Sequence, residues 1–238
     1  MYDTYIFDLD GTLLDTLDDL TAATNHALRS CGMPVHSRDD VRRFVGNGVR
    51  RLMERAVPGG ASHPQFEQAL DTFRQYYLEH SLDSTRPYDG IPELLTTLRQ
   101  QGRHVAVVSN KFCTATQELC QHFFADTVEV AIGENEAAGI RKKPAPDTVM
   151  EALCQISCGL QIRNNDDSGN NDDSGNNDDS GNDGERAVYI GDSEVDLLTA
   201  RNAGLPCISV LWGFRDRDFL LAHGATTLAA CPADILAL

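Results

Sequence analysis

The chain has 238 residues, of which 41% are hydrophobic, so it can build a packed core and global disorder is excluded. Its formal net charge of −16 disfavours binding to nucleic acid or to an anionic membrane surface. No run of 18 apolar residues is present, and the acidic start predicts no secretory signal. Seven cysteines without a Cys-x-x-Cys spacing favour free thiols in a reducing cytoplasm over disulfides or zinc.

Short apolar runs alternate with helical patterns over most of the chain. We predict strands over 4–7, 104–108, 127–132, 187–190 and 207–211, and helices over 91–101, 114–122, 146–158 and 195–203. Several of these strands are almost continuously apolar, which is typical of a parallel sheet covered on both faces. The alternation therefore predicts an α/β fold with a doubly wound, Rossmann-like parallel-sheet core.

Residues 15–83 break this alternation, because they show helical periods only. Apolar side chains recur at helical spacing, as in Leu17, Leu20, Ala23 and Ala27. We predict an all-helical cap domain over 15–83, inserted into an α/β core domain of residues 1–14 and 84–238. The two crossings, near 14–16 and 84–87, are candidate hinges.

Residues 164–184 form a low-complexity repeat of Asn, Asp, Ser and Gly. They contain no apolar side chain that could offset the entropy of ordering them. Asp and Asn can bind calcium, but the repeat does not fit the Asp-x-Asp-x-Asp-Gly loop with its distal Glu. We interpret the segment as a flexible insertion within the core domain.

Polar and charged residues follow the predicted strands at the points where they end. In an open α/β sheet, ligands bind beyond the carboxyl ends of the strands, so these side chains are expected to converge. One further lysine lies in the loop beyond the third strand. The candidate site residues are Asp8, Asp10, Ser109, Asn110, Lys143, Asp192 and Asp196.

This combination of side chains suits phosphoryl transfer. Carboxylates that meet at one edge repel one another unless a cation compensates them, and all-oxygen donors suit Mg²⁺. Ser109, Asn110 and Lys143 then remain as donors to an anion. One aspartate can attack phosphorus to give an acyl phosphate, while a second carboxylate gives and takes a proton.

Four ordered motifs carry a family resemblance. They are Asp8-Leu9-Asp10-Gly11-Thr12, Val107-Val108-Ser109-Asn110, Lys143-Pro144-Ala145-Pro146 and Gly191-Asp192-Ser193-Glu194-Val195-Asp196. With them the chain resembles the haloacid dehalogenase superfamily, in its Mg²⁺-dependent phosphatase branch. The resemblance covers the whole chain except the Asn/Asp/Ser/Gly repeat.

The resemblance implies a role for each acidic residue. Asp8 is expected to be the nucleophile and a metal ligand, and Asp10 the general acid/base, which binds the metal through its carbonyl oxygen. Asp192 is expected to bind Mg²⁺, and Asp196 to support the metal site without binding the ion directly. The true dehalogenases lack the second aspartate of the first motif, so Asp10 favours a phosphatase.

The resemblance also assigns the substrate side of the site. Ser109 and Lys143 are expected to hold the phosphate, with Asn110 nearby, and the helical insert to close over the site as a cap. Residues 44–52 and 211–214 are similar to stretches of phosphoglycolate phosphatases, although pyrophosphatases and sugar phosphatases share parts of them. We therefore expect a small phosphate ester, such as 2-phosphoglycolate, as substrate of a cytoplasmic monomer or homodimer.

Two alternative functions use similar residues. A phosphomutase of the same superfamily would return the phosphoryl group to a sugar and would need a bisphosphate activator. A phospho-accepting signalling receiver also uses Asp, Ser or Thr, Lys and Mg²⁺. Receivers, however, have no helical insert after their first strand, and they hold the phosphate for long periods.

Overall fold

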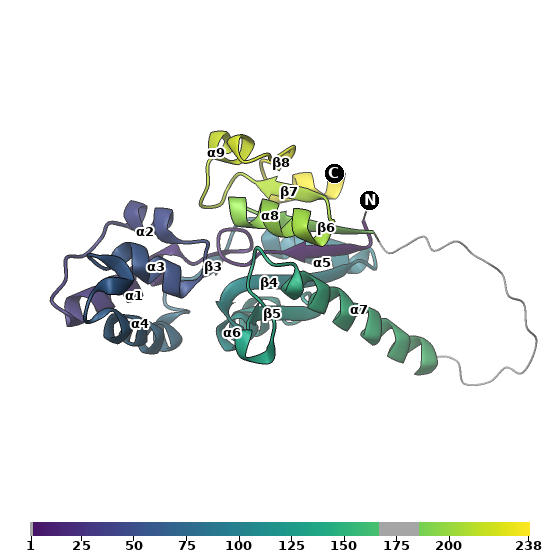
Figure 1. The fold of residues 1–238 in the computed structure, drawn as a ribbon. Helices are drawn as coiled ribbons and strands as arrows, with labels where there is room; N and C mark the ends of the chain where they lie inside the picture. Colours follow the sequence, from purple (N-terminus) through teal and green to yellow (C-terminus); the bar gives the residue numbers. More distant parts are fainter. Residues whose placement is uncertain (1, 167–185) are drawn as a thin grey trace, which may run out of the picture.

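A six-stranded parallel sheet forms the centre of the protein in the computed structural model, which describes residues 2–166 and 186–238 (Figure 1). The strand order is β5-β4-β1-β6-β7-β8. The strands are β1 (Thr4–Phe7), β4 (His104–Phe112), β5 (Val130–Glu134), β6 (Ala187–Gly191), β7 (Cys207–Val210) and β8 (Thr227–Ala229). This confirms the predicted Rossmann-like α/β core.

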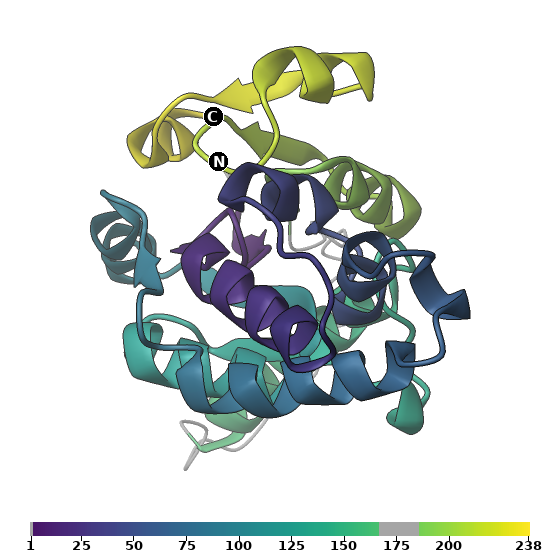
Figure 2. The same cartoon turned by 90° about the vertical axis from the view of Figure 1, so that its left-hand side faces the viewer.

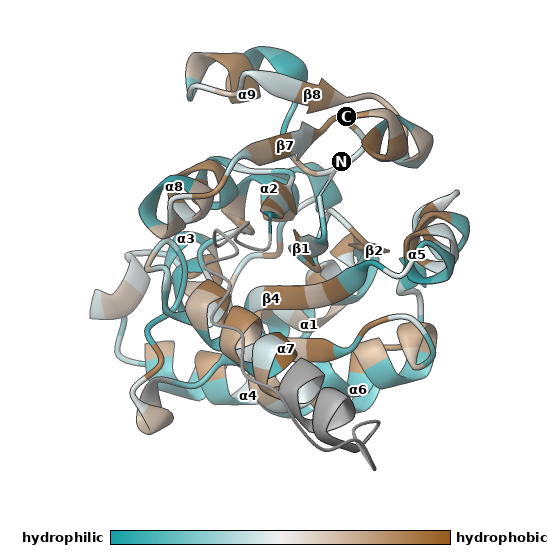
Figure 3. Ribbon diagram, turned by 90° about the vertical axis from the view of Figure 1, so that its right-hand side faces the viewer, coloured by the Kyte–Doolittle hydropathy of each residue, from teal (hydrophilic) through white to brown (hydrophobic). Residues whose placement is uncertain are grey.

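Helices cover both faces of the sheet. Alternate side chains of each strand point to opposite faces, so each strand contributes to both layers of packing. Tyr5 and Phe7 pack with helices α5 (Ile91–Gln100) and α6 (Cys113–Phe124). Ile6, between them, packs with α7 (Asp147–Asp166) and α8 (Glu194–Ala203) on the other face. Figure 3 shows the resulting concentration of apolar residues along β4. Two-sided burial explains why the strands read as continuous apolar runs.

A second group of helices lies beyond one end of the sheet. These helices, α1 (Leu17–Ser30), α2 (Arg38–Phe44), α3 (Val49–Ala56) and α4 (Phe66–His80), are called the cap below. They enclose an apolar cluster of their own, which contains the predicted apolar positions and also Phe214 of the core. In Figure 2 the cap lies in front of the sheet. The exact domain limits stay a prediction.

The two connections between core and cap lie side by side. β2 (Leu14–Asp15) pairs antiparallel with β3 (Arg86–Pro87), a contact that the sequence analysis missed. Strands this short show no periodicity, so no pattern could reveal them. The buried carboxylate of Asp19 accepts hydrogen bonds from the amides of Ser84 and Thr85, at 3.0 and 2.8 Å, and from the Thr85 hydroxyl at 2.8 Å. Helix α1 is therefore tied to the returning connection.

Several element limits differ from the expectation. The predicted strand 104–108 continues to Phe112, and α7 continues through Asp166 into the first residues of the repeat. Residues 167–185 lie outside the described part, so the predicted flexibility of 164–184 is not addressed there. The short elements β8 and α9 (Arg217–Ala222) were not predicted. All seven cysteines are free thiols, and none of the described helices is long and apolar enough to cross a membrane.

Replacing Asp19 by Asn should destabilise the fold by about 1.5–3 kcal/mol, because a neutral amide accepts these buried hydrogen bonds less well than a charged carboxylate does. Asp18→Asn is the matched control: it removes the same charge from the same helical turn, but its partner Arg38 is exposed. Chemical denaturation measures the free energy of unfolding of both variants. Equal losses in the two variants would contradict the role of Asp19.

Candidate active site

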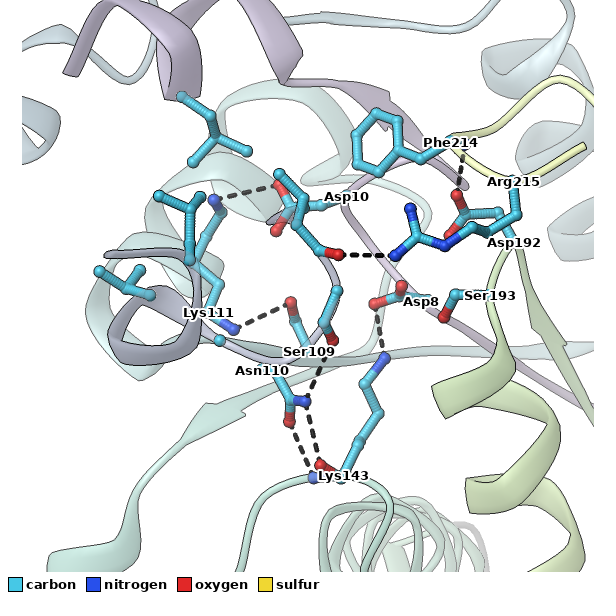
Figure 4. A pocket seen from close by; sticks show the side chains of 16 residues that line it. Asp8, Asp10, Ser109, Asn110, Lys111, Lys143, Asp192, Ser193, Phe214 and Arg215 are labelled. Carbon is cyan, nitrogen blue, oxygen red and sulfur yellow. Dashed lines mark hydrogen bonds and ion pairs between the residues drawn. The ribbon is translucent and has the colours of Figure 1, made fainter. Parts of the chain in front are cut away.

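The predicted site residues gather at the carboxyl edge of the sheet. Six of them line one pocket between core and cap: Asp8, Asp10, Ser109, Asn110, Lys143 and Asp192 (Figure 4). The seventh, Asp196, lies behind the pocket wall and contacts Lys143. Carboxylate oxygens of Asp8, Asp192 and Asp196 all lie within 4.8 Å of one another. Distant parts of the sequence thus meet at one acidic centre.

Lys143 is a buried cation at this centre. Its ammonium nitrogen lies 2.7 Å from Asp8 Oδ1 and 2.8 Å from Asp196 Oδ1, and it donates to the Tyr189 hydroxyl at 3.1 Å. The side chain is almost completely buried. Burial works to lower the pKa of Lys143, but the Asp196 and Asp8 carboxylates outweigh it and hold the pKa above its usual range. Lys143 therefore stays charged and faces the pocket.

Asp196 is held by hydrogen bonds from several donors. Oδ1 accepts from Lys143 Nζ and from the Tyr189 hydroxyl at 3.0 Å. Oδ2 accepts from the Ser193 hydroxyl at 2.6 Å and the Ser193 amide at 3.1 Å, which closes a capping box at the start of α8. Gly191 leaves the space for this carboxylate, because a Cβ there would lie 2.4 Å from Asp196 Cγ. Asp196 thus orients Lys143 from behind.

Asn110 holds the backbone on which Lys143 is carried. Its Oδ1 accepts from the Lys143 amide at 2.8 Å, and its Nδ2 donates to the Lys143 carbonyl at 3.1 Å. This pair joins β4 to the loop that carries Lys143. Asn110 lines the pocket, as does Ser109, whose hydroxyl accepts from the Lys111 amide at 3.2 Å.

Ser109, Asn110 and Lys111 lie inside β4 and not after its end, which corrects the predicted strand limit. The pairing of β4 with β5 shifts register between Val108 and Phe112. Such an irregularity bends a strand and re-aims its side chains, and here it brings polar groups to the pocket. The apolar run stops at Val108, and for this reason the sequence pattern predicts the end of the strand there.

Lys111 is a pocket residue to which the sequence analysis gave no role. Its ammonium lies 3.0 Å from Asp10 Oδ1 and donates to the Tyr77 hydroxyl of α4 at 2.7 Å. Lys111 therefore connects the second aspartate of the first motif to the cap. The scarcity of lysine in the sequence could have pointed to Lys111, which is one of only three lysines in the chain; the other two are adjacent, at 142 and 143.

The acidic centre has the chemistry of a divalent-cation site. Burial, followed by the charge of Asp196, raises the pKa of Asp8 to about 7. Burial and the charges of Asp196 and Asp8 likewise raise the pKa of Asp192 well above its usual range. Such shifts indicate negative charge that the protein alone does not fully compensate. Oxygen donors at this spacing fit Mg²⁺.

Two glycines make room beside Asp192. A Cβ on Gly11 would lie 2.5 Å from Asp192 Oδ2, and a Cβ on Gly213 would lie 2.3 Å from Asp192 Cβ. Gly11 also has a φ of +89°, which other residues rarely adopt. The chain thus passes closer to this carboxylate than any residue with a side chain would allow.

Comparison with known proteins places the chain in a family. Haloacid dehalogenase-like hydrolases match residues 5–166, and a second HAD-hydrolase-like family matches residues 140–236. The chain belongs to the haloacid dehalogenase-like hydrolases. The phosphoglycolate phosphatase of Caulobacter vibrioides is 32% identical over 248 aligned positions, covering 97% of this chain and 94% of that protein.

Other relatives of this haloacid dehalogenase-like hydrolase are also phosphatases. The N-acetylmuramic acid 6-phosphate phosphatase of Pseudomonas aeruginosa is 29% identical, with 97% of this chain and 92% of that protein covered. A crystal structure from Lactobacillus delbrueckii subsp. bulgaricus, provisionally assigned as a phosphoglycolate phosphatase, is 33% identical with a TM-score of 0.78. The match covers 98% of this chain and 96% of that one. The chain is therefore a phosphatase of this family.

Cation binding should change how the stability of the protein depends on pH. The folded-state pKa of Asp8, about 7, exceeds its ordinary value of 3.8, so without a cation the folded state binds this proton more tightly. The resulting stabilisation is fully present below pH 3.8 and is lost as the pH rises through about 7.

Mg²⁺ should therefore raise the melting temperature more at pH 8 than at pH 5, because at pH 5 it competes with bound protons. Thermal unfolding in Mg²⁺ and in EDTA measures the difference. Asp8→Asn should reduce the pH dependence of the shift. A shift that is equal at the two pH values, or larger at pH 5, would contradict this account.

Proposed function

We propose that this phosphatase is a Mg²⁺-dependent phosphomonoesterase that works through an aspartyl-phosphate on Asp8. The observation that carries the proposal is the position of Asp8. Its carboxylate lines the pocket 2.7 Å from the Lys143 ammonium and within 4.8 Å of Asp192. A nucleophile, a fixed cation and a metal-binding carboxylate therefore surround one small space, which is what attack on phosphorus requires.

In the first step the Asp8 carboxylate attacks phosphorus and forms an acyl phosphate. The bond from phosphorus to the ester oxygen breaks, and the Asp10 carboxyl gives its proton to the departing oxygen. Lys143 and the Ser109 hydroxyl hold the phosphoryl oxygens. Mg²⁺, held by Asp8, Asp192 and the Asp10 carbonyl, would neutralise the charge that develops on these oxygens.

In the second step water attacks the phosphorus of the acyl phosphate. Asp10, now a carboxylate, takes a proton from this water, and orthophosphate leaves while the Asp8 carboxylate is restored. The Lys111 ammonium, 3.0 Å from Asp10 Oδ1, holds this carboxylate in place for both proton transfers. The atoms and protons balance over the two steps, so no further reactant is needed.

The lining of the pocket supports a small anionic ester, with 2-phosphoglycolate as the proposed substrate. The pocket is small, since the centres of water-sized molecules can occupy a cavity volume of only about 40 Å³. Three cationic side chains line it, Lys111, Lys143 and Arg215, in a chain whose net charge is −16. Its apolar wall, which includes Val45 and Phe214, suits a short ester that the closed cap covers.

Asp8→Asn should reduce turnover about a thousandfold or more while leaving the fold intact, because an amide cannot form the acyl phosphate. Asp71→Asn, at an exposed carboxylate paired with Arg74, should leave turnover unchanged. Phosphate release in Mg²⁺ measures activity, and circular dichroism checks the fold. Mg²⁺-dependent hydrolysis that persists in Asp8→Asn would contradict the mechanism.

Among phosphate esters, we expect 2-phosphoglycolate to give a kcat/KM about tenfold or more above that of p-nitrophenyl phosphate, whose leaving group carries no carboxylate. N-acetylmuramic acid 6-phosphate is the third substrate to measure, since it also carries a carboxylate. A higher kcat/KM for this sugar phosphate would overturn the proposed substrate.

Two further outcomes would indicate the alternative functions. A requirement for a bisphosphate activator would indicate a mutase, and a long-lived aspartyl-phosphate would indicate a receiver.

A further inference from the structure

The cap and the core are joined above Asp192 by a reciprocal pair of arginines. Arg42 of α2 donates from Nε to the Phe214 carbonyl at 2.8 Å and from Nη2 to the Gly213 carbonyl at 3.0 Å. In return, Arg215 of the core donates to the carbonyls of Arg42 and Val45 in the cap, at 3.1 and 2.9 Å. Arg215 is itself held by Glu194, 3.3 Å away.

One peptide group of this junction touches both the cap and the acidic centre. The carbonyl of the Gly213–Phe214 peptide accepts from Arg42, and the N–H of the same peptide donates to Asp192 Oδ2 at 2.5 Å. A peptide group is planar and rigid, so its two ends move together. A cation at the carbonyl oxygen also polarises the peptide, which strengthens the N–H as a donor.

The packing leaves this peptide little freedom relative to Asp192. A Cβ on Gly213 would lie 2.3 Å from Asp192 Cβ and 2.4 Å from the Gly11 carbonyl oxygen, so the backbone itself is in contact with the carboxylate. Asp192 is 1% exposed. In so dense a setting, a shift of the peptide must shift the carboxylate.

We propose that Arg42 is a positioning residue which, through the Gly213–Phe214 peptide, orients Asp192 for cation binding when the cap is docked. The inference rests on the proposed function, because the role of Asp192 as a Mg²⁺ ligand belongs to it. Coupling of this kind is reciprocal: a docked cap strengthens binding of the ion, and the bound ion favours the docked cap.

Titration of the full-length protein with Mg²⁺ alone, followed by calorimetry, tests the proposal without any turnover. Arg42→Ala should weaken Mg²⁺ binding about tenfold, as loss of a group that orients a metal ligand does. The sign is diagnostic: removing a positive charge near an acidic centre would by itself strengthen binding of a cation. Arg42→Lys keeps the charge and one donor group, so it should recover part of the affinity.

Arg43→Ala is the matched control, since Arg43 lies next to Arg42 on α2 but is exposed and contacts Asp40. Its Mg²⁺ affinity should equal that of the wild type or slightly exceed it. In Arg42→Ala, activity should return towards the wild-type kcat at saturating Mg²⁺, because the ion is bound less tightly but used in the same way.

Mg²⁺ binding by folded Arg42→Ala that equals or exceeds wild-type binding would overturn the proposal. If Arg42→Ala fails to fold by circular dichroism, Arg42→Lys is judged by the same criterion. A wild type that binds no Mg²⁺ would overturn it as well. A wild type that binds Mg²⁺ but hydrolyses no phosphate ester would instead end the proposed function, and the affinities of the variants would still decide the role of Arg42.

Discussion

The ammonium of Lys143, buried between the carboxylates of Asp8 and Asp196, is the interaction on which the site depends. Asp8, Asp192 and Asp196 lie so close together that their charges would oppose folding without compensation. Lys143 supplies a positive charge from within the protein, and Asn110 fixes the backbone that carries it. One ammonium cannot balance three carboxylates, and the excess negative charge is what makes the centre suited to a divalent cation.

The parallel sheet determines where these charged side chains lie relative to one another. β1 pairs with β4 on one side and β6 on the other, so Asp8 lies between the polar segment of β4 and Asp192. The core therefore supplies the carboxylates, Lys111 and Lys143 from β4, from the ends of β1 and β6, from the first turn of α8 and from one loop. The contacts by which the cap reaches the same edge include those of Tyr77 with Lys111 and of Arg42 with the 213–214 peptide.

The features that depend on local pattern and strand order, namely the parallel sheet and the polar residues at its carboxyl edge, could be predicted from the sequence. The apolar runs indicated the sheet, and the residues that follow β1 and β6 were placed at its edge because parallel strands end together. The sequence predicts no role for Lys111, because the direction of its side chain depends on a register shift within β4. Arg42 and Gly213 are 171 positions apart, and no local pattern indicates their contact. Whether Asp8 is the nucleophile is a question of chemistry that stays a prediction.

The pairing of β2 with β3 has a consequence for how such a chain can diversify. Because the outgoing and returning connections are paired, the cap between them is one continuous insertion that leaves and re-enters the core at the same place. Exchanging this insertion would replace the side of the pocket that the cap forms, while β1, β4 and β6 kept their register. Much of the pocket lining contributed by the cap could therefore change without altering the sheet, as long as Arg42 and Tyr77, which connect the cap to the acidic centre, were retained.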